Sequence, residues 1–252
     1  MTAALLLHQL RFEQLSFWRT REAAFFIFAF PILLLLLLGL VYDGEIEGHP
    51  AANWLLVGML GYGAANTAFG GLAITLVLRR EYAQLKRIRG TPLPAGVYLA
   101  AVVVSSLLVF ALQSVVLYAL GVLLFDAELP DRPFSLALAL LFGAAAFTGL
   151  GLGAAALIRS AEGVSPVVNF VVLPLAFLSG SFGPTDRYPD AIEAFASLLP
   201  LKHFIDMLAA VALDAEPLTS QATALAVFGA WGAAAFLVAY RWFEWSPRHG
   251  VS

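Results

Sequence analysis

The sequence predicts an all-α integral membrane protein with six transmembrane helices, and three observations lead to this prediction. Of the 252 residues, 61% are hydrophobic and only 12% are charged, whereas soluble domains carry about 25% charged residues. Six apolar runs each approach or exceed the roughly 20 residues that a helix needs to cross a bilayer. The basic residues lie mainly in alternate connections between these runs, as is typical of multi-pass membrane proteins.

The whole chain, residues 1–252, is expected to form a single transmembrane domain. Residues 1–22 combine Leu, Phe and Trp with polar and basic side chains, which predicts an N-terminal helix lying in the membrane interface. The spans follow at residues 23–42, 54–78, 97–125, 134–158, 164–182 and 221–243. The third run is longer than a bilayer requires, so a tilt or a protruding end is expected. Residues 183–220 are expected to form an extracellular segment.

The distribution of charge predicts the orientation. If the N-terminus lies in the cytoplasm, eleven of the 14 Lys and Arg residues lie in cytoplasmic segments. The three exceptions are Arg132, Arg187 and Lys202. Twelve of the 17 acidic residues lie in the external segments. An excess of basic residues marks the cytoplasmic side of bacterial membrane proteins, so both termini are expected in the cytoplasm.

Polar residues within the spans are few and uncharged. No Asp, Glu, Lys, Arg or His falls in the middle of a predicted span. Proton-coupled carriers generally keep such a residue to bind the coupling ion, so a proton-driven pump is disfavoured. A gradient-driven carrier that needs no ATPase stays the alternative. The candidates for lining a substrate pathway are Asn66, Thr67, Gln113 and Asn169. Hydrogen bonding between helices is the alternative role of these four side chains, and it stays open.

Enzymatic motifs are weak or missing. The chain has no cysteine, and its four histidines lie in separate segments, so neither a thiol nucleophile nor a metal site is expected. "SGSFG" at residues 179–183 resembles a serine elbow, but Ser179 stands where the motif requires Gly, and His203 is the only candidate base for Ser181. An intramembrane hydrolase is therefore disfavoured. No P-loop motif is present, and we expect no catalytic residue or cofactor.

The stretch "LRREYAQLKRIRGTPLP", residues 78–94, contains five of the 14 Lys and Arg residues. As a helix, it places Leu78, Tyr82, Leu85 and Ile88 on one side. The following "GTPLP" ends the helix, because Gly and Pro do not continue one. This predicts a short amphipathic helix at the cytoplasmic surface, joined rigidly to the spans on either side. An anchor for topology or for anionic lipid explains the charges but not the compact helix.

Two stretches resemble the permeases of the ABC type-2 transporter family. "RREYAQLKRIRGTPLP" is similar to the segment after the second span of these permeases, in which an Arg-Glu pair, a basic-apolar alternation and Thr-Pro-Leu follow in this order. Ala83 stands where the family usually has Gly. "PLAFLSGSFGPTDRYPDAIEAFASLLPLKHFIDMLAAV", residues 174–211, is similar to the end of the fifth span, followed by an external Pro-Leu and an amphipathic helix that leads to the sixth span.

The resemblance implies the function and the partners. In this family, residues 79–91 would form a coupling helix that docks on a separate P-loop ATPase. The contact residues would be Arg80, Glu81, Tyr82, Leu85, Lys86, Arg87 and Arg89. Two ATPase copies and two permease subunits, identical or different, would form an exporter in the bacterial inner membrane, in contact with lipid and without nucleic acid. The substrate would be an amphipathic or hydrophobic drug, lipid or lipid-linked glycan, and the sequence does not choose among them.

Overall fold

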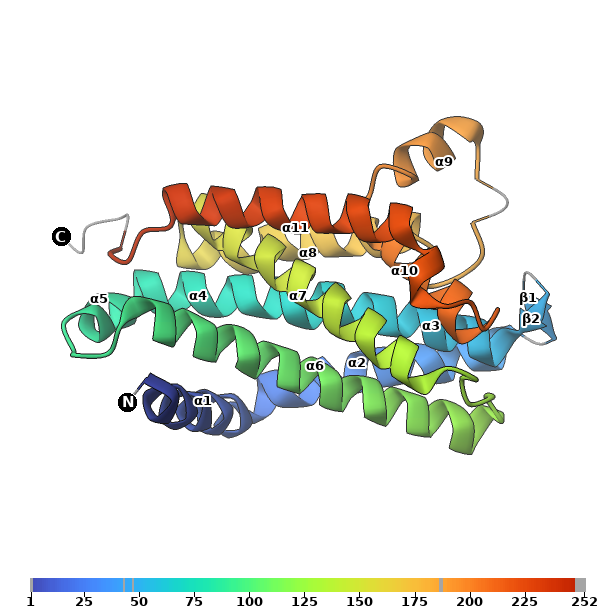
Figure 1. The fold of residues 1–252 in the computed structure, drawn as a ribbon, viewed down its shortest axis with the longest axis horizontal. Helices are drawn as coiled ribbons and strands as arrows, with labels where there is room; N and C mark the ends of the chain where they lie inside the picture. The colour runs from blue at the N-terminus through green and yellow to red at the C-terminus, as the bar shows by residue number, and fades with distance from the viewer. Residues whose placement is uncertain (1, 43, 47, 186–187, 248–252) are drawn as a thin grey trace.

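The computed structural model describes residues 2–42, 44–46, 48–185 and 188–247, which form a bundle of α-helices (Figure 1). Among these residues, six helical segments are long and apolar enough to cross a membrane. The structure therefore confirms the predicted all-α membrane fold. The six segments are α2 (Arg21–Val41), the continuous run from Ala51 to Glu81, α6 (Ala95–Phe125), α7 (Pro133–Leu157), α8 (Ala161–Leu178) and α11 (Ala222–Trp242).

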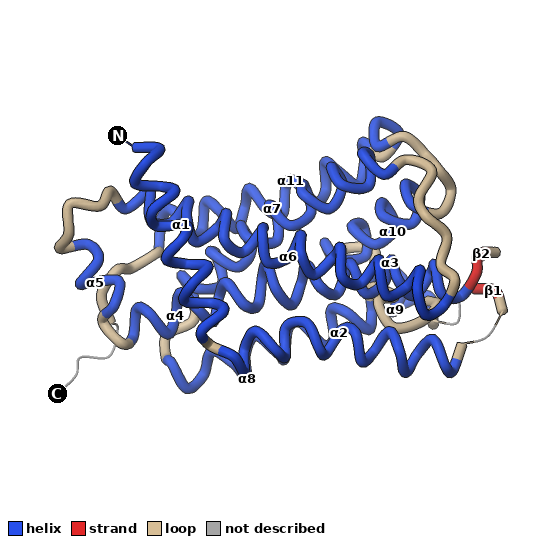
Figure 2. The backbone as a smooth tube through the Cα atoms, turned by 90° about the horizontal axis from the view of Figure 1, so that it is seen from below, coloured by secondary structure: helices blue, strands red, loops and turns tan. Residues whose placement is uncertain are grey.

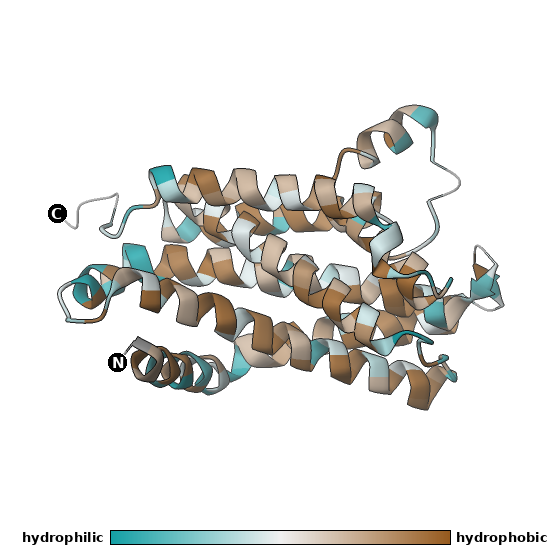
Figure 3. Ribbon diagram, viewed as in Figure 1, coloured by the Kyte–Doolittle hydropathy of each residue, from teal (hydrophilic) through white to brown (hydrophobic). Residues whose placement is uncertain are grey.

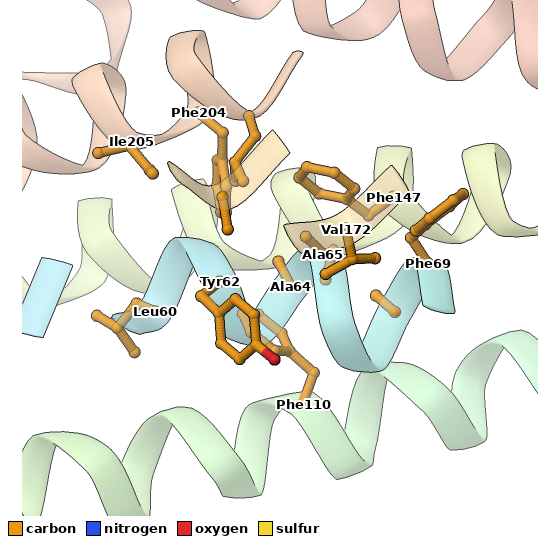
Figure 4. Packing of buried hydrophobic residues seen from close by; sticks show 14 of the residues in the cluster. Leu60, Tyr62, Ala64, Ala65, Phe69, Phe110, Phe147, Val172, Phe204 and Ile205 are labelled. Carbon is orange, nitrogen blue, oxygen red and sulfur yellow. The ribbon is translucent and has the colours of Figure 1, made fainter. Parts of the chain in front are cut away.

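The second span forms the centre of the bundle. It consists of α3 (Ala51–Gly63), a π-helical segment η1 (Ala64–Gly71) and α4 (Leu72–Glu81). It packs against α2, α6, α7 and α8, and most of its side chains are buried. Figure 4 shows Tyr62 and Phe69 of this span among buried side chains that include Phe110 of α6 and Phe147 of α7. A π-helical turn within a span often marks a functional position, and η1 carries Asn66 and Thr67.

The polar surface of the molecule is concentrated at the two ends of the bundle. Figure 3 shows hydrophobic residues along the length of the spans and hydrophilic residues near α5 and near the opposite end. At that opposite end, β1 (Glu45–Ile46) and β2 (His49–Pro50) form an antiparallel hairpin. The short 3₁₀ helix η2 (Leu218–Ser220) precedes α11. A hydrophobic belt between two polar ends is the surface expected of a membrane-spanning bundle.

Helix α1 (Thr2–Arg19) is a separate element that breaks from α2 at Thr20. It runs across α6 at the end of the bundle (Figures 1 and 2). The amide of Gln14 donates hydrogen bonds to the carbonyl (3.1 Å) and the hydroxyl (2.9 Å) of Ser105 in α6. Helix α1 also exposes four large apolar side chains: Leu7, Phe12, Leu15 and Trp18. These exposed apolar residues suit contact with lipid, and the interfacial position of α1 stays a prediction.

The segment expected outside the membrane, 183–220, contains a helix that packs inside the bundle. Helices α9 (Asp190–Ala196) and α10 (Pro200–Ala212) meet at an angle of 86°. The ring of Phe204 in α10 lies 5.8 Å from that of Phe147 and 5.4 Å from that of Phe228, centroid to centroid. It also fills the space next to Gly143, where a Cβ would collide with it. Gly143 lies ten residues along α7, about 15 Å from its start.

The physical reason for this placement is the spacing of apolar residues in α10. Its buried side chains recur three and four residues apart and form one face. They are Leu201, Phe204, Ile205, Leu208 and Val211. Such a face needs a partner, and Gly143 and Gly61 leave room for Phe204 and Ile205 respectively. The segment therefore re-enters the bundle between α3, α7 and α11, and is not a surface segment throughout.

The expected continuous helix from Leu78 to Arg89 is interrupted. Helix α4 ends at Glu81, and the six-residue helix α5 (Gln84–Arg89) begins after Ala83. Ala83 has a φ of 57°, in the left-handed region, which cannot continue a right-handed helix. Glycine adopts this conformation at the lowest cost, which agrees with the Gly that the resembled family usually has here. The periodicity of the apolar residues gave no sign of this break.

Small residues let α7 and α11 approach closely. A Cβ on Gly149 would lie 3.0 Å from the carbonyl oxygen of Gly232, and one on Gly153 would lie 2.9 Å from that of Ala235. The four-residue spacing of Gly149 and Gly153 places both on the side of α7 that faces α11. Close packing of backbones through small residues is a major source of helix association in membranes.

We expect Gly149→Leu to destabilise the fold, because a larger side chain would push α11 away from α7. Overpacking of this kind costs about 1–3 kcal/mol. The measurement is the thermal unfolding midpoint and the folded yield in detergent. Gly229→Leu is the matched control, since a Cβ there would meet only Phe142, at 3.7 Å. Equal midpoints for the two variants would contradict the proposed packing.

Candidate functional site

Two consecutive arginines at the end of α4 point in different directions and join four helices. Arg79 pairs with Glu13 of α1 (Nη1–Oε2, 2.7 Å) and donates a hydrogen bond to the hydroxyl of Tyr98 in α6 (2.8 Å). Arg80 donates to the backbone carbonyl oxygens of Ala155 (2.7 Å) and Ile158 at the end of α7. The end of the second span is thus fixed to α1 and α6 on one side and to α7 on the other.

Arg80 is fully buried and its charge is balanced within the chain. Its Nε donates to the carboxylate of Glu81 at 2.8 Å, and the Glu81 side chain is only 8% exposed. Two carbonyl oxygens and one carboxylate therefore surround the guanidinium and accept hydrogen bonds from it. Arginine suits this position because its planar guanidinium presents several N–H donors in fixed directions. The sequence predicts that Arg80 and Glu81 contact a partner protein, but both side chains face the interior. Leu85 is also fully buried.

The remaining predicted contact residues are exposed. Tyr82 is 61% exposed, and Lys86, Arg87 and Arg89 of α5 are exposed as well. We call these four residues the α5 surface. The sequence predicts that Tyr82 packs on the same side as Leu85, and this prediction is wrong because the left-handed Ala83 lies between them and changes the direction of the chain. The structure thus divides the predicted set into three internal residues and four surface residues.

A cavity of about 410 Å³ lies beside the Arg79–Glu13 pair. Its walls come from α1, α2, the second span and α6. Polar side chains occupy its end near α5, where Glu13, Arg79, Tyr82 and Gln84 line it. Hydroxyl groups line it further in: Ser16, Thr20, Thr67, Thr75, Ser105 and Ser106. The cavity is not predictable from the sequence, because its walls come from four segments that no single motif connects.

The four predicted pathway residues do not form one site. The hydroxyl of Thr67 donates to Oε1 of Gln113 (3.0 Å), and Nε2 of Gln113 donates to the carbonyl oxygen of Ile27 (2.6 Å). These two side chains thus join η1, α6 and α2. Asn66 is half-buried on η1, and Asn169 is exposed on α8. Only Thr67, of the four, lines the cavity.

The geometry gives no support to a hydrolase. The hydroxyls of Ser179 and Ser181 are buried and have no hydrogen-bond partner within the described residues. A ring nitrogen of His203, the only candidate base, is hydrogen-bonded to the carbonyl oxygen of Ser197 (2.8 Å). Within the part of the chain that the structure describes, no three His, Asp or Glu side chains are grouped as metal ligands would be.

Comparison with known proteins identifies the family to which this chain is similar. The model of the ABC-2 type transporter family matches residues 5–213. The transport permease YvfS of Bacillus subtilis is 28% identical over 150 residues, which is 59% of this chain and 61% of YvfS. Two nodulation proteins J also match. The one from Bradyrhizobium diazoefficiens is 41% identical over 46 residues, 18% of each chain. The one from Rhizobium leguminosarum bv. viciae is 38% identical over 63 residues, 25% of this chain and 24% of that protein.

These alignments cover less than two thirds of the relatives' own lengths. The family match is broader, since residues 5–213 include α1, five of the six spanning segments and α10. It also includes the Arg79–Glu13 and Arg80–Glu81 pairs and the α5 surface.

Replacing Arg80 tests its internal role. We expect Arg80→Ala to lower the free energy of unfolding by about 3–5 kcal/mol, because Glu81 would lose the cation next to it in a buried setting. The measurement is chemical or thermal unfolding of the purified chain in detergent. Arg87→Ala is the control, because Arg87 is exposed and its only hydrogen bond among the described residues is to the carbonyl oxygen of Tyr82 (3.3 Å). Similar losses for both variants would show that the buried position of Arg80 is unimportant.

Proposed function

The chain belongs to the ABC-2 type transporter family, and we propose that it forms the membrane pathway of an ATP-driven exporter. Membership makes it a multi-pass transport permease subunit of an ABC transporter, and the family implies an ABC ATPase as partner. The observation that supports our proposal most directly is the α5 surface. Three basic side chains of the short helix α5 and the aromatic side chain of Tyr82, at the end of α4, are exposed next to a firmly anchored span.

The α5 surface has the properties of a docking site for the ATPase. Tyrosine and arginine are frequent at the centres of protein interfaces, and Tyr82, Arg87 and Arg89 supply both. The helix is short, but the buried Leu85 and the buried Arg80 hold it and the end of α4 against the bundle. A force applied to the α5 surface would therefore reach the spans and not only a flexible loop.

We place the α5 end of the bundle in the cytoplasm of a bacterium. The start of α1, the end of α11 and α5 lie at this end (Figure 1). Exposed basic residues are concentrated there, in α1, α2, α5, α11 and the α7–α8 connection. Arg132 and Lys202 start α7 and α10 at the other end, and Arg187 and Arg248 lie outside the described residues. By the excess of basic residues, the α5 end faces inward. The terminal residues 1 and 248–252 also lie outside the described residues.

A second permease subunit would cover α8. Ser165 and Asn169 are exposed on this helix, among apolar side chains such as Phe170 and Phe177. An amide in contact with hydrocarbon loses its hydrogen bonds to water, which is costly. A neighbouring subunit or a hydrated pathway between two subunits removes this cost. We therefore propose that α8 faces the pathway of a dimer, with Asn169 as a lining residue. The partner is an identical or a related chain, driven by two ATPase copies.

An amphipathic or hydrophobic substrate fits these spans best. Hydroxyl and amide groups are present in the spans, and the charged groups of the six spanning segments lie near the ends of these segments. A drug, a lipid or a lipid-linked glycan would cross such a route without meeting an uncompensated charge. The missing charge in mid-span also disfavours a proton-driven pump.

Reconstitution tests the proposal directly. The permease and its ATPase subunit would be inserted together into proteoliposomes, and the movement of fluorescent lipid and drug probes would be measured with and without ATP. ATP-dependent outward movement is expected. Transport that persists on an ion gradient after ATP is withheld would instead establish a secondary carrier.

Charge reversal tests the docking role of α5. We expect Lys86→Glu combined with Arg87→Glu to reduce co-purification of the ATPase by at least about tenfold, because like charges at an interface are repulsive. The fold should be unchanged, since both side chains are exposed. The control, Arg159→Glu combined with Arg241→Glu, makes the same charge change at exposed positions of the same end. Equal losses in the two double variants would argue against a specific α5 contact.

Two substitutions separate pathway lining from helix packing. Gln113→Leu should lower stability by about 1–2 kcal/mol, because Thr67 and the Ile27 carbonyl would lose their partner. Asn169→Leu should change the free energy of unfolding by no more than about 0.5 kcal/mol but alter the transport rate or the substrate preference. Unfolding in detergent and transport in proteoliposomes would be measured for both. If Asn169→Leu lowers stability and leaves transport normal, α8 does not line the pathway.

A further inference from the structure

The cavity next to the Arg79–Glu13 pair is long and follows one face of the second span. Its lining residues on that span extend from Thr67 to Tyr82, which is a length of about 22 Å along a helix. Gly71, Thr75 and Leu78 lie between them on the same face. The opposite walls come from α1 and α2 on one side and from α6 on the other. A cavity of this length suits an extended ligand better than a compact one.

The two ends of the cavity differ in polarity. Ser16, Thr20, Tyr82 and Gln84 at the α5 end are exposed, so the cavity opens there. Further along the span, Ile27, Leu72 and Val109 make the wall largely apolar, with single hydroxyl groups between them. This order of polar mouth and apolar interior matches a molecule with one polar end and one hydrocarbon chain.

The residues that line the cavity carry no net charge. Glu13 and Arg79 both line the cavity, but they neutralise each other at 2.7 Å, and Arg79 also donates to Tyr98. A charged head group would therefore gain little by entering, whereas a hydrocarbon chain would meet no unpaired charge. The charged part of the ligand belongs at the mouth.

The mouth is flanked by basic residues. Arg19 and Arg21 stand on either side of Thr20, and Lys86 and Arg87 follow Gln84 closely; all four are exposed. Glu22, which follows Arg21, is the exposed acidic residue next to these four basic residues. Basic residues between helices at the cytoplasmic side of a membrane attract anionic lipid head groups. The excess of positive charge thus selects an anionic ligand over a neutral one.

We propose that this cavity binds an anionic phospholipid of the cytoplasmic leaflet, with an acyl chain along the second span and the phosphate at the basic mouth. The proposal rests on the proposed orientation, in which the α5 end faces the cytoplasm. A lipid in this position contacts α1, α2, α4 and α6 at once. It therefore supports the attachment of α1 to the bundle together with the Arg79–Glu13 pair.

Filling the cavity tests the position of the acyl chain. Gly71 lines the cavity, and the nearest atoms to a Cβ there are the carbonyl oxygen of Asn66 (3.6 Å) and Cδ1 of Ile27 (4.0 Å). Gly71→Leu therefore adds volume to the cavity without a backbone collision. Gly229→Leu is the matched control in α11, where the nearest atom is at 3.7 Å. The full-length permease would be purified in mild detergent, titrated with phosphatidylglycerol, and the bound lipid counted by native mass spectrometry.

We expect Gly71→Leu to weaken phosphatidylglycerol binding by at least about tenfold and Gly229→Leu to leave it unchanged, since a well-filled interior does not admit a further chain. Both variants must keep the wild-type unfolding midpoint within the error of the measurement. If Gly71→Leu lowers the midpoint, the smaller Gly71→Ala and the lining substitution Thr75→Leu replace it. Unchanged binding in folded cavity variants would overturn the proposal.

Replacing the basic residues tests the head-group preference. Arg19→Gln combined with Arg21→Gln should reduce the preference for phosphatidylglycerol over phosphatidylcholine, by about fivefold for each residue. Arg159→Gln combined with Arg241→Gln removes the same charge from the same end and should leave the preference intact. Equal binding of both lipids by the wild-type chain would overturn the anionic assignment.

Lipid binding by the isolated permease requires no ATPase and no transport, so its outcome is independent of the reconstitution assay. If the orientation is opposite, cysteine introduced at Gln84 will be labelled from outside intact cells, and the leaflet named here will be wrong although the lipid is still bound. If the molecule retained through purification is a transported compound and not a phospholipid, the lipid assignment is overturned.

Discussion

Burial of the Arg80 guanidinium beside the end of α7 is the constraint on which the rest of the α5 end of the bundle depends. An ionised group inside a protein must have its charge balanced and its donors satisfied. Glu81 and two carbonyl oxygens of α7 meet this need, which fixes where the second span ends relative to the fourth. With that end fixed, Arg79 is directed to Glu13 and Tyr98, and the positions of α1 and α6 follow.

In the middle of the bundle, the fit of large side chains next to glycines determines how the helices pack, and charge pairs do not. Gly143 accommodates Phe204, Gly149 and Gly153 let α7 approach α11, and Gly58 lies against the backbone of Ser181. Lipid surrounds the spans, so apolar burial against water does not drive these contacts, and close packing must supply the stabilisation. The helix α10 enters the bundle for the same reason, because Gly143 provides a space that its aromatic side chain fills.

Structural elements that depend on local sequence patterns could be predicted, whereas contacts between segments far apart in the chain could not. Long apolar runs identified the spans, since their length must match the bilayer. The four-residue spacing of Gly149 and Gly153 favours a close helix contact but does not identify the partner helix. The adjacent Arg79 and Arg80 look equivalent in the sequence, and only the positions of α1 and α7 show that one faces a cavity and the other a helix end. The backbone of Ala83 reverses its handedness without any change in hydrophobic periodicity.

The break at Ala83 explains how a short surface helix can belong to a rigid unit. A continuous helix would carry Tyr82 and Leu85 along one face, whereas the left-handed residue turns α5 so that Leu85 is buried and Tyr82 is exposed. The buried leucine anchors α5, and the exposed tyrosine and basic residues remain available to a partner. Because Arg79 and Arg80 bind opposite sides of the bundle within one turn of this break, a displacement of α5 would be transmitted to α1 and α7 through the contacts of these two arginines. The same two residues that stabilise the fold are therefore the shortest physical connection between the α5 surface and the spans.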